Sequence, residues 1–190
     1  MSEKKCTMEE LERGIRSCLL CPLHATRTNA VPGEGPSSPS IMLIGEAPGR
    51  NEDLEGKPFC GSAGSHLDYF LDKANLNRND IFITSIVKCR PPNNRVPKLE
   101  EANACKQNWL LNQIQLLNPK IIGLMGRVAI QHLLGEEIDL GKRHGTLIHS
   151  NGLNFFVLYH PAAVIYNQSL KDTIENDFRK LASLSHSALE

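Results

Sequence analysis

The segment that most constrains the fold is an apolar run that stops abruptly at a glycine-rich loop. Residues 41–44 are Ile-Met-Leu-Ile, and residues 45–64 continue as GEAPGRNEDLEGKPFCGSAG. A short apolar run bounded by turn residues is typical of a buried strand. In open α/β sheets, ligands bind just beyond the carboxyl ends of the strands, and glycines let backbone N–H groups approach them closely. We therefore predict a strand that leads into a binding pocket.

The rest of the chain alternates between predicted helices and strands. Helices are predicted near 7–19, 65–76, 98–117, 127–134 and 170–184, and strands at 41–44, 81–87, 121–125 and, more weakly, 145–149 and 155–159. Thr7 and Glu10 have the spacing of a capping box at the first helix. This alternation predicts an α/β protein whose sheet is mostly parallel and covered by helices on both faces. We expect one domain over residues 1–190, with frayed tails at 1–6 and 185–190.

The composition excludes several classes of protein. The chain is 41% hydrophobic and 22% charged, as is ordinary for a globular domain, and no apolar run approaches the length of a membrane span. The polar, acidic start MSEKKCTMEE is unlike a secretory signal, so we expect a cytoplasmic protein with no membrane partner. Because the formal net charge is zero, binding to nucleic acid would need a local basic face.

Four cysteines have an arrangement that suggests a metal centre. Cys18 and Cys21 form a Cys-x-x-Cys at the end of the first predicted helix, Cys89 lies in a loop, and Cys105 lies on a helix. In a cytoplasmic chain such thiols are more often ligands or free thiols than disulfides. Their spacing does not choose between zinc and an iron–sulfur cluster. The alternative is that some of them are small buried hydrophobic residues.

Three further motifs accompany the Cys-x-x-Cys: GEAPGRNEDLEGKPFCGSAG at 45–64, VKCRPPNNRVP at 87–97 and HPAA at 160–163. In this order, over roughly residues 10–182, the chain resembles the family 4 uracil-DNA glycosylases, the iron–sulfur branch of that superfamily. The resemblance implies a three-layer α/β/α fold with a four-stranded, mostly parallel sheet. It also implies a 4Fe–4S cluster on Cys18, Cys21, Cys89 and Cys105. The implied reaction is hydrolysis of the N-glycosidic bond of uracil flipped out of single- or double-stranded DNA, without strand cleavage.

The same resemblance gives individual residues expected roles. His160 would donate a hydrogen bond to uracil O2, and Glu46 would position or activate the attacking water. Phe59 would stack on the flipped base, and Glu52 would crowd uracil C5 and so exclude thymine. The remaining base contacts are expected from the glycine-rich loop and the second strand, at Gly45, Ala47, Gly49 and Ser85. Preorganised donors matter here because uracil leaves as an anion.

Ser85 departs from the pattern of the family, which usually has Asn at this position. A carboxamide both donates and accepts across the uracil edge, whereas a serine hydroxyl is shorter and has one oxygen. We therefore expect weaker uracil recognition, or a specificity shifted toward other deaminated bases. An alternative is a damaged-DNA-binding protein of the same fold that turns over poorly. A third hypothesis is a metal-binding module whose glycine-rich loop acts on nucleotides.

DNA must also be held by its phosphates, and basic residues in two regions are candidates for that role: Lys88, Arg90, Arg95, Lys142 and Arg143. Residues 162–170, which include Tyr166 and Asn167, could wedge into the duplex as the base leaves. Asp53 is expected to brace the loop that follows the first strand. The sequence gives no sign of oligomerisation, so we expect a monomer.

Overall fold

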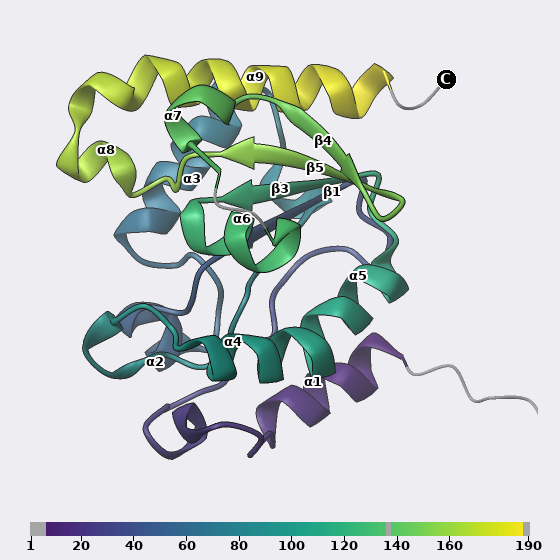
Figure 1. Ribbon diagram of the computed structural model, residues 1–190, viewed down its shortest axis with the longest axis vertical. Helices are drawn as coiled ribbons and strands as arrows, with labels where there is room; N and C mark the ends of the chain where they lie inside the picture. The colour runs from purple at the N-terminus through teal and green to yellow at the C-terminus, as the bar shows by residue number, and fades with distance from the viewer. Residues whose placement is uncertain (1–6, 136–137, 188–190) are drawn as a thin grey trace, which may run out of the picture.

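A five-stranded sheet forms the centre of the computed structural model, which describes residues 7–135 and 138–187 (Figure 1). The strand order is β2-β1-β3-β5-β4. The parallel strands are β1 (Ile41–Gly45), β2 (Ile81–Ser85), β3 (Ile121–Met125) and β5 (Leu153–Leu158). The edge strand β4 (Leu147–Ser150) is antiparallel to β5. The predicted α/β class is confirmed, but the sheet has five strands rather than four because this hairpin adds one.

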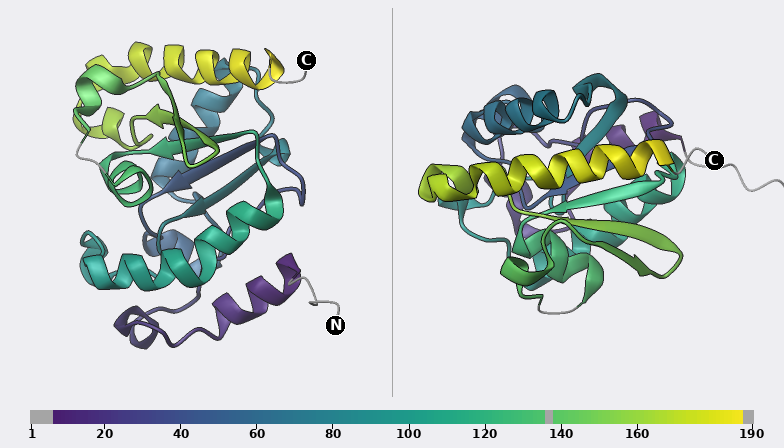
Figure 2. Two further views of the ribbon diagram at one scale, coloured as in Figure 1. Left: turned by 45° about the vertical axis from the view of Figure 1, so that its right-hand side comes forward. Right: turned by 90° about the horizontal axis from the view of Figure 1, so that it is seen from above.

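Helices cover both faces of the sheet, as Figure 2 shows. One face carries α3 (Ser62–Lys73), α8 (Ala163–Tyr166) and α9 (Lys171–Ser187). The other carries α4 (Leu99–Cys105), α5 (Leu111–Leu117), α6 (Arg127–Leu134) and α7 (Leu140–Arg143), and α1 (Met8–Arg16) packs on the outer side of α5. A π-helical turn, Lys106–Leu110, joins α4 to α5, so the helix predicted at 98–117 is one continuous rod. None of the helices in the described ranges is long and apolar enough to cross a membrane.

The strand β1 is apolar throughout because both of its faces are buried. Met42 and Ile44 pack into the core beneath α4, α5 and α6, whereas Ile41 and Leu43 pack against α3 and α9. Side chains alternate between the two faces of a strand, so a strand covered on both sides needs an unbroken apolar run. This explains why residues 41–44 identify the centre of the sheet.

The structure corrects three details of the sequence prediction. The capping box of Thr7 and Glu10 is present, but α1 ends at Arg16 rather than near residue 19, and Leu19 is 70% exposed. Residues 50–55, expected as loop, form the helix α2 (Arg50–Glu55). The helix α9 continues to Ser187, so the prediction of a frayed tail is wrong for 185–187. The predicted tails at 1–6 and 188–190 lie outside the described residues.

Candidate active site and thiol cluster

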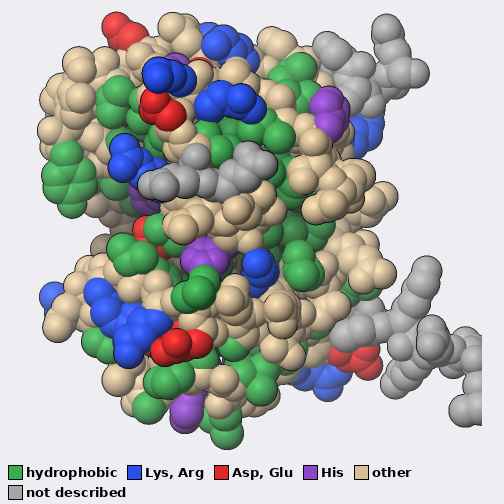
Figure 3. Space-filling view, in the orientation of Figure 1, with side chains coloured by type: hydrophobic (Ala, Val, Ile, Leu, Met, Phe, Trp, Pro, Cys, Tyr) green, Lys and Arg blue, Asp and Glu red, His purple; other side chains and the backbone are tan. Residues whose placement is uncertain are grey.

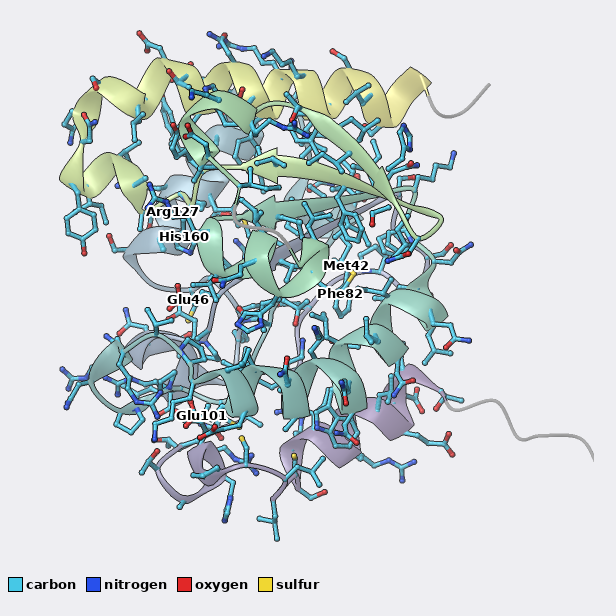
Figure 4. The ribbon with its side chains drawn as sticks, viewed as in Figure 1. Met42, Glu46, Phe82, Glu101, Arg127 and His160 are labelled. Carbon is cyan, nitrogen blue, oxygen red and sulfur yellow. The ribbon has the colours of Figure 1, made fainter. Side chains whose placement is uncertain are left out.

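A cavity of about 280 Å³ opens at the carboxyl edge of the sheet. Four separated segments supply its walls: Glu46 follows β1, Ser85 ends β2, Phe59 precedes α3, and His160 follows β5. The labelled Glu46 and His160 lie near each other on this side of the sheet in Figure 4. Three more of the expected base-contacting residues also line the cavity: Ala47, Gly49 and Glu52. The topology of parallel strands therefore brings together residues that are far apart in the sequence.

Phe59 is held across the end of β1 in an unusual backbone conformation. Its φ is +49°, which non-glycine residues rarely adopt, and its side chain is buried. A Cβ on Gly45 would lie 2.8 Å from the ring atom Cζ of Phe59, and a Cβ on Gly64 would collide with the Phe59 carbonyl oxygen. Gly45 therefore does not line the cavity but makes room for the ring that does.

Arg78 fixes this turn, and the sequence analysis did not identify it. Its Nη2 donates to the carbonyl oxygen of Pro58 at 2.8 Å, and its Nη1 forms an ion pair with Asp68 at 2.7 Å. Arg78 lies well downstream of Phe59, so no local motif links the two. Its contact with the turn is visible only in the folded chain.

His160 is poised to donate from one ring nitrogen. Its Nδ1 accepts a hydrogen bond from the backbone N–H of Ala162 at 3.2 Å, which requires the proton of the neutral ring to be on Nε2. Burial lowers the pKa of His160 to about 4, so the ring is neutral at physiological pH. A neutral imidazole that accepts at Nδ1 can donate an N–H from Nε2.

The two carboxylates of the loop after β1 have different environments. Burial raises the pKa of Glu46 above its usual value, as expected for a group held in a partly dry cavity. Glu52, in contrast, accepts three backbone hydrogen bonds, from Gly49 at 3.1 Å, Cys60 at 3.1 Å and Gly61 at 2.9 Å. Glu52 thus ties the loop after β1 to the turn before α3. Glu52 also lines the cavity. Its expected contact with uracil C5 stays a prediction.

Asp53 braces a different segment from the one expected. Its buried carboxylate accepts hydrogen bonds from the backbone N–H groups of Thr28 at 2.8 Å and Asn29 at 3.3 Å. It therefore anchors the chain that leaves the Cys-x-x-Cys segment onto α2.

Lys88 does not belong to a basic DNA-binding face. Its side chain is only 1% exposed, and its Nζ donates to Thr84 Oγ1 at 2.5 Å and to the Ser85 carbonyl oxygen at 2.8 Å. The prediction that Lys88 contacts DNA is wrong, because the side chain turns back into the protein beside β2.

The other predicted DNA-contacting cations differ in how they are paired. Arg95 lines the cavity and forms a bidentate pair with the buried carboxylate of Glu101, at 2.7 and 2.9 Å. Arg90 donates to Asn94 within its own loop. Lys142 and Arg143 are exposed on α7. In Figure 3, Lys and Arg side chains lie over α7 above the hollow at the left of the molecule and near the start of α4 below it.

Two exposed side chains lie on segments that adjoin His160 in the chain or in space. Tyr166, at the end of α8, is 89% exposed, which the prediction that it wedges into DNA requires. Arg127 begins α6 directly after Gly126, whose φ of +92° lets β3 turn sharply into the helix. A Cβ on Gly126 would lie 3.2 Å from the Cβ of His160. The residue directly before Arg127 therefore packs against His160. Figure 4 labels Arg127 and His160 on the same side of the sheet, and no sequence motif had pointed to Arg127.

The four predicted metal-ligating cysteines gather at one end of the molecule. The thiols lie close enough to raise one another's pKa values. Cys18 acts in this way on Cys21, Cys18 and Cys21 act on Cys89, and Cys21 and Cys89 act on Cys105. Burial raises the pKa values of the Cys21 and Cys89 thiols, and that of Cys105 to about 12. Each thiol also has an N–H donor: Trp109 Nε1 to Cys18 at 3.3 Å, backbone Leu23 to Cys21, Arg27 Nη1 to Cys89 at 3.0 Å, and backbone Lys88 to Cys105.

The chemistry of these side chains is that of a thiolate donor set. Among the described residues, no group of three or more His, Cys, Asp or Glu side chains is placed to hold one metal ion. N–H donors aimed at the sulfurs are the contacts that stabilise cluster-bound thiolates. The donor set of this chain is thus compatible with an iron–sulfur cluster.

Comparison with known proteins identifies the class to which this fold and cavity belong. The profile of the Uracil DNA glycosylase superfamily matches residues 32–182, and the chain belongs to that superfamily. It is 39% identical over 186 residues to the Type-4 uracil-DNA glycosylase of Archaeoglobus fulgidus, covering 94% of this chain and 93% of that protein. It is also 44% identical to the Type-4 uracil-DNA glycosylase of Saccharolobus solfataricus, over 88% of this chain and 81% of that protein. The Type-4 uracil-DNA glycosylase of Thermotoga maritima is 38% identical, with 93% of each chain covered.

Proposed function

We propose that this protein is a monofunctional uracil-DNA glycosylase that flips uracil out of DNA and hydrolyses its N-glycosidic bond, leaving an abasic site. The observation that carries the proposal is the convergence of Glu46, Phe59, Ser85 and His160 on one cavity. Membership of the superfamily and the similarity to Type-4 uracil-DNA glycosylases support it.

His160 is proposed to stabilise the departing base. Cleavage of the glycosidic bond leaves negative charge on uracil, and a neutral Nε2–H donor would meet that charge at O2. A low pKa suits this role, because the ring is then neutral at physiological pH and has one N–H, on Nε2, to donate to uracil. The backbone N–H groups of the glycine-rich loop would supply further donors.

Glu46 is proposed to orient and activate the attacking water. In its ionised form the carboxylate can accept a proton from water and also offset the positive charge that develops on the sugar. Its raised pKa makes it a better base than an exposed glutamate. Phe59 would stack on the extruded base, with Gly45 beneath the ring.

Ser85 is the reason for a second candidate function, a damaged-DNA-binding protein. Its side chain lines the cavity, and the resemblance to family 4 implies Asn at this position. A single hydroxyl cannot pair with both N3–H and O4 of uracil as a carboxamide does, so one polar edge of the base would lose a partner. A protein that recognises damaged DNA but excises uracil slowly is therefore the alternative.

A 4Fe–4S cluster is proposed to be held by the four cysteines Cys18, Cys21, Cys89 and Cys105. The cluster would supply a covalent crosslink between the N-terminal segment and the loop that carries Cys89. The residues around it would keep the thiolates deprotonated through the four N–H donors described above. Arg27 contributes most plainly, since its guanidinium donates to Cys89 and to the Arg16 carbonyl oxygen at 2.9 Å.

DNA is proposed to cross the mouth of the cavity, with cations on both sides. Lys142 and Arg143 lie on α7, and Arg90 and Arg95 lie in the loop after Cys89. Arg127 adds a cation beside His160. Tyr166 would fill the space that the base vacates. Single- and double-stranded DNA are both candidate substrates, and the enzyme is proposed to act as a monomer.

The proposal is tested by incubating the purified protein with labelled oligonucleotides that contain one uracil, in single- and double-stranded form. We expect an alkali-sensitive abasic site at the uracil and no strand break before alkali treatment. Binding without any abasic product would favour the damaged-DNA-binding alternative. Neither binding nor excision would refute both.

A further inference from the structure

We propose that Lys88 is a positioning residue that joins the thiol cluster to the base cavity, with its buried ammonium both holding the end of β2 and serving as counter-charge to the thiolates. The part that concerns the base rests on the proposed glycosylase function, and the part that concerns the charge rests on the proposed cluster.

The side chain of Lys88 holds the strand end that faces the base. Its Nζ donates to the Ser85 carbonyl oxygen at 2.8 Å and to Thr84 Oγ1 at 2.5 Å. Thr84 in turn donates to the carbonyl oxygen of Pro32 at 2.8 Å. The hydroxyl of Ser85 lines the cavity, so the ammonium fixes the peptide that aims this side chain.

The backbone of Lys88 contacts both the thiol cluster and the wall of the base cavity. Its N–H donates to the Cys105 thiol, and its carbonyl oxygen accepts from the N–H of Val31 at 2.7 Å. Val31 lines the cavity, and Cys89 is the next residue in the chain. One residue therefore touches a thiol, a cavity wall and the strand end that carries Ser85.

The ammonium is buried without a carboxylate. In the described part of the chain, no ion pair joins Lys88 to an acidic side chain, although the residue is only 1% exposed. Burial lowers the pKa of Lys88 to about 8, and the nearby Cys105 thiol opposes this shift. A buried charge needs a compensating charge, and thiolates bound to a cluster would provide it. A positive charge at this place would also favour the reduced form of the cluster, because reduction adds negative charge.

The first experiment compares the reduction potential of the cluster in the wild-type protein, Lys88→Met and Lys106→Met. Met has a similar length and no charge. Lys106 is the matched control, since it follows Cys105 directly but is only half-buried and donates to the His132 carbonyl oxygen at 2.8 Å. We expect a more negative potential in Lys88→Met than in the other two proteins. Equal potentials in all three would overturn the counter-charge role.

The second experiment measures the inhibition constant of free uracil, which probes the cavity without DNA. Thr84→Val removes one acceptor of Lys88 and leaves its charge in place. We expect about five-fold weaker uracil binding in Thr84→Val, the loss typical of one hydrogen bond, with an unchanged potential. Unchanged uracil binding in this variant would overturn the positioning role, even where Lys88→Met fails to fold.

Measurements of iron content, uracil binding and uracil excision on the wild-type protein distinguish a failure of this proposal from a failure of the glycosylase function or of the cluster. Wild-type protein that excises uracil but binds no iron would refute the cluster and the counter-charge role together, and would leave the glycosylase function intact. Wild-type protein that binds iron but neither excises nor binds uracil would refute the glycosylase function and the positioning role. A cluster-containing, active wild type whose variants behave alike would refute the role of Lys88 alone.

Discussion

The ring of Phe59 lies 5.7 Å from that of His160, centroid to centroid, with 31° between the ring planes. Phe59 comes from the turn before α3 and His160 from the end of β5, so only the sheet brings them together. The pair forms one side of the cavity, and Glu46 and Ser85 also line it. A planar base between these groups would meet an aromatic face and a neutral N–H donor at once.

Replacing His160 with Ala should lower kcat about 100-fold, since one preorganised donor to a developing anion contributes about 3 kcal/mol. Binding of uracil-containing DNA should change much less, because phosphate contacts dominate affinity. Single-turnover excision and a gel-shift titration measure the two effects. The account of His160 is wrong if binding falls as much as excision.

The pH dependence of excision should have its acid limb above pH 4.5, set by Glu46. Burial raises the pKa of Glu46 above this usual value, and excision needs its ionised form, so the rate falls as the pH drops through that pKa. The pKa of His160 is about 4, so this residue stays neutral over the same range and adds no limb near pH 6.5. Rate constants between about pH 4.5 and 8 test this.

The variant Glu46→Gln is the control for that profile. Its excision should be slow and no longer depend on pH in the acid range, because the titrating group is gone. A limb that persists in Glu46→Gln would assign it to another residue.

Ser85→Asn should raise excision of uracil, since the carboxamide can pair with both N3–H and O4. The gain expected from one additional hydrogen bond to the base is about five-fold in kcat/KM. Ser85→Ala serves as the matched control, because it removes the hydroxyl without adding an amide. Unchanged or lower activity of Ser85→Asn on uracil would refute this explanation of the substitution.

Arg95→Ala should destabilise the fold as well as weaken DNA binding. The variant leaves the buried carboxylate of Glu101 without its bidentate partner, so the free energy of unfolding should fall. Arg95 lowers the pKa of Glu101, so this stabilisation is present above the unfolded pKa of about 4.5 and is lost as the pH falls through the lower folded value. Urea unfolding at neutral and acidic pH measures it.

Arg90→Ala is the control for Arg95. Its guanidinium contacts only Asn94 among the described residues, so its loss should weaken DNA binding with little change in stability. Equal destabilisation of the two variants would mean that the pair with Glu101 contributes nothing.

Arg127→Ala should weaken binding to all DNA sequences and reduce the slope of log affinity against log salt by about 0.9, the loss of one phosphate contact. Arg127 is exposed, so the free energy of unfolding should change little. Binding titrations at several salt concentrations measure the slope. An unaltered slope would remove Arg127 from the DNA interface.

Sequence reasoning predicted those features that depend on local patterns. The buried run at 41–44 and the strand and helix at 121–134 were found because burial on both faces and helical periodicity leave clear signatures. His160 was assigned through the resemblance of the HPAA motif, and the structure places it at the cavity. Lys88 was misplaced because a lysine beside Arg90 looks like part of a basic loop, whereas its direction depends on Thr84 and the Ser85 carbonyl oxygen.

Other features could not be predicted because they depend on long-range contacts. Within the helix α2, Glu52 accepts locally from the Gly49 N–H, but its contact with the Gly61 N–H, in the turn before α3, depends on the fold. Arg78 acts on Phe59 from beyond α3, and Arg127 lies beside His160 only because β3 and β5 are neighbours. The functional glycine Gly45 was recognised, but its contact with the Phe59 ring required the fold.

The most direct test is a crystal structure of the protein with DNA that carries one uracil nucleotide made resistant to hydrolysis. We predict that the uracil is extruded, with one face on the Phe59 ring, O2 within hydrogen-bonding distance of His160 Nε2, and a water between Glu46 and the sugar. A uracil that stays stacked in the DNA, or binds away from these three side chains, would contradict the account.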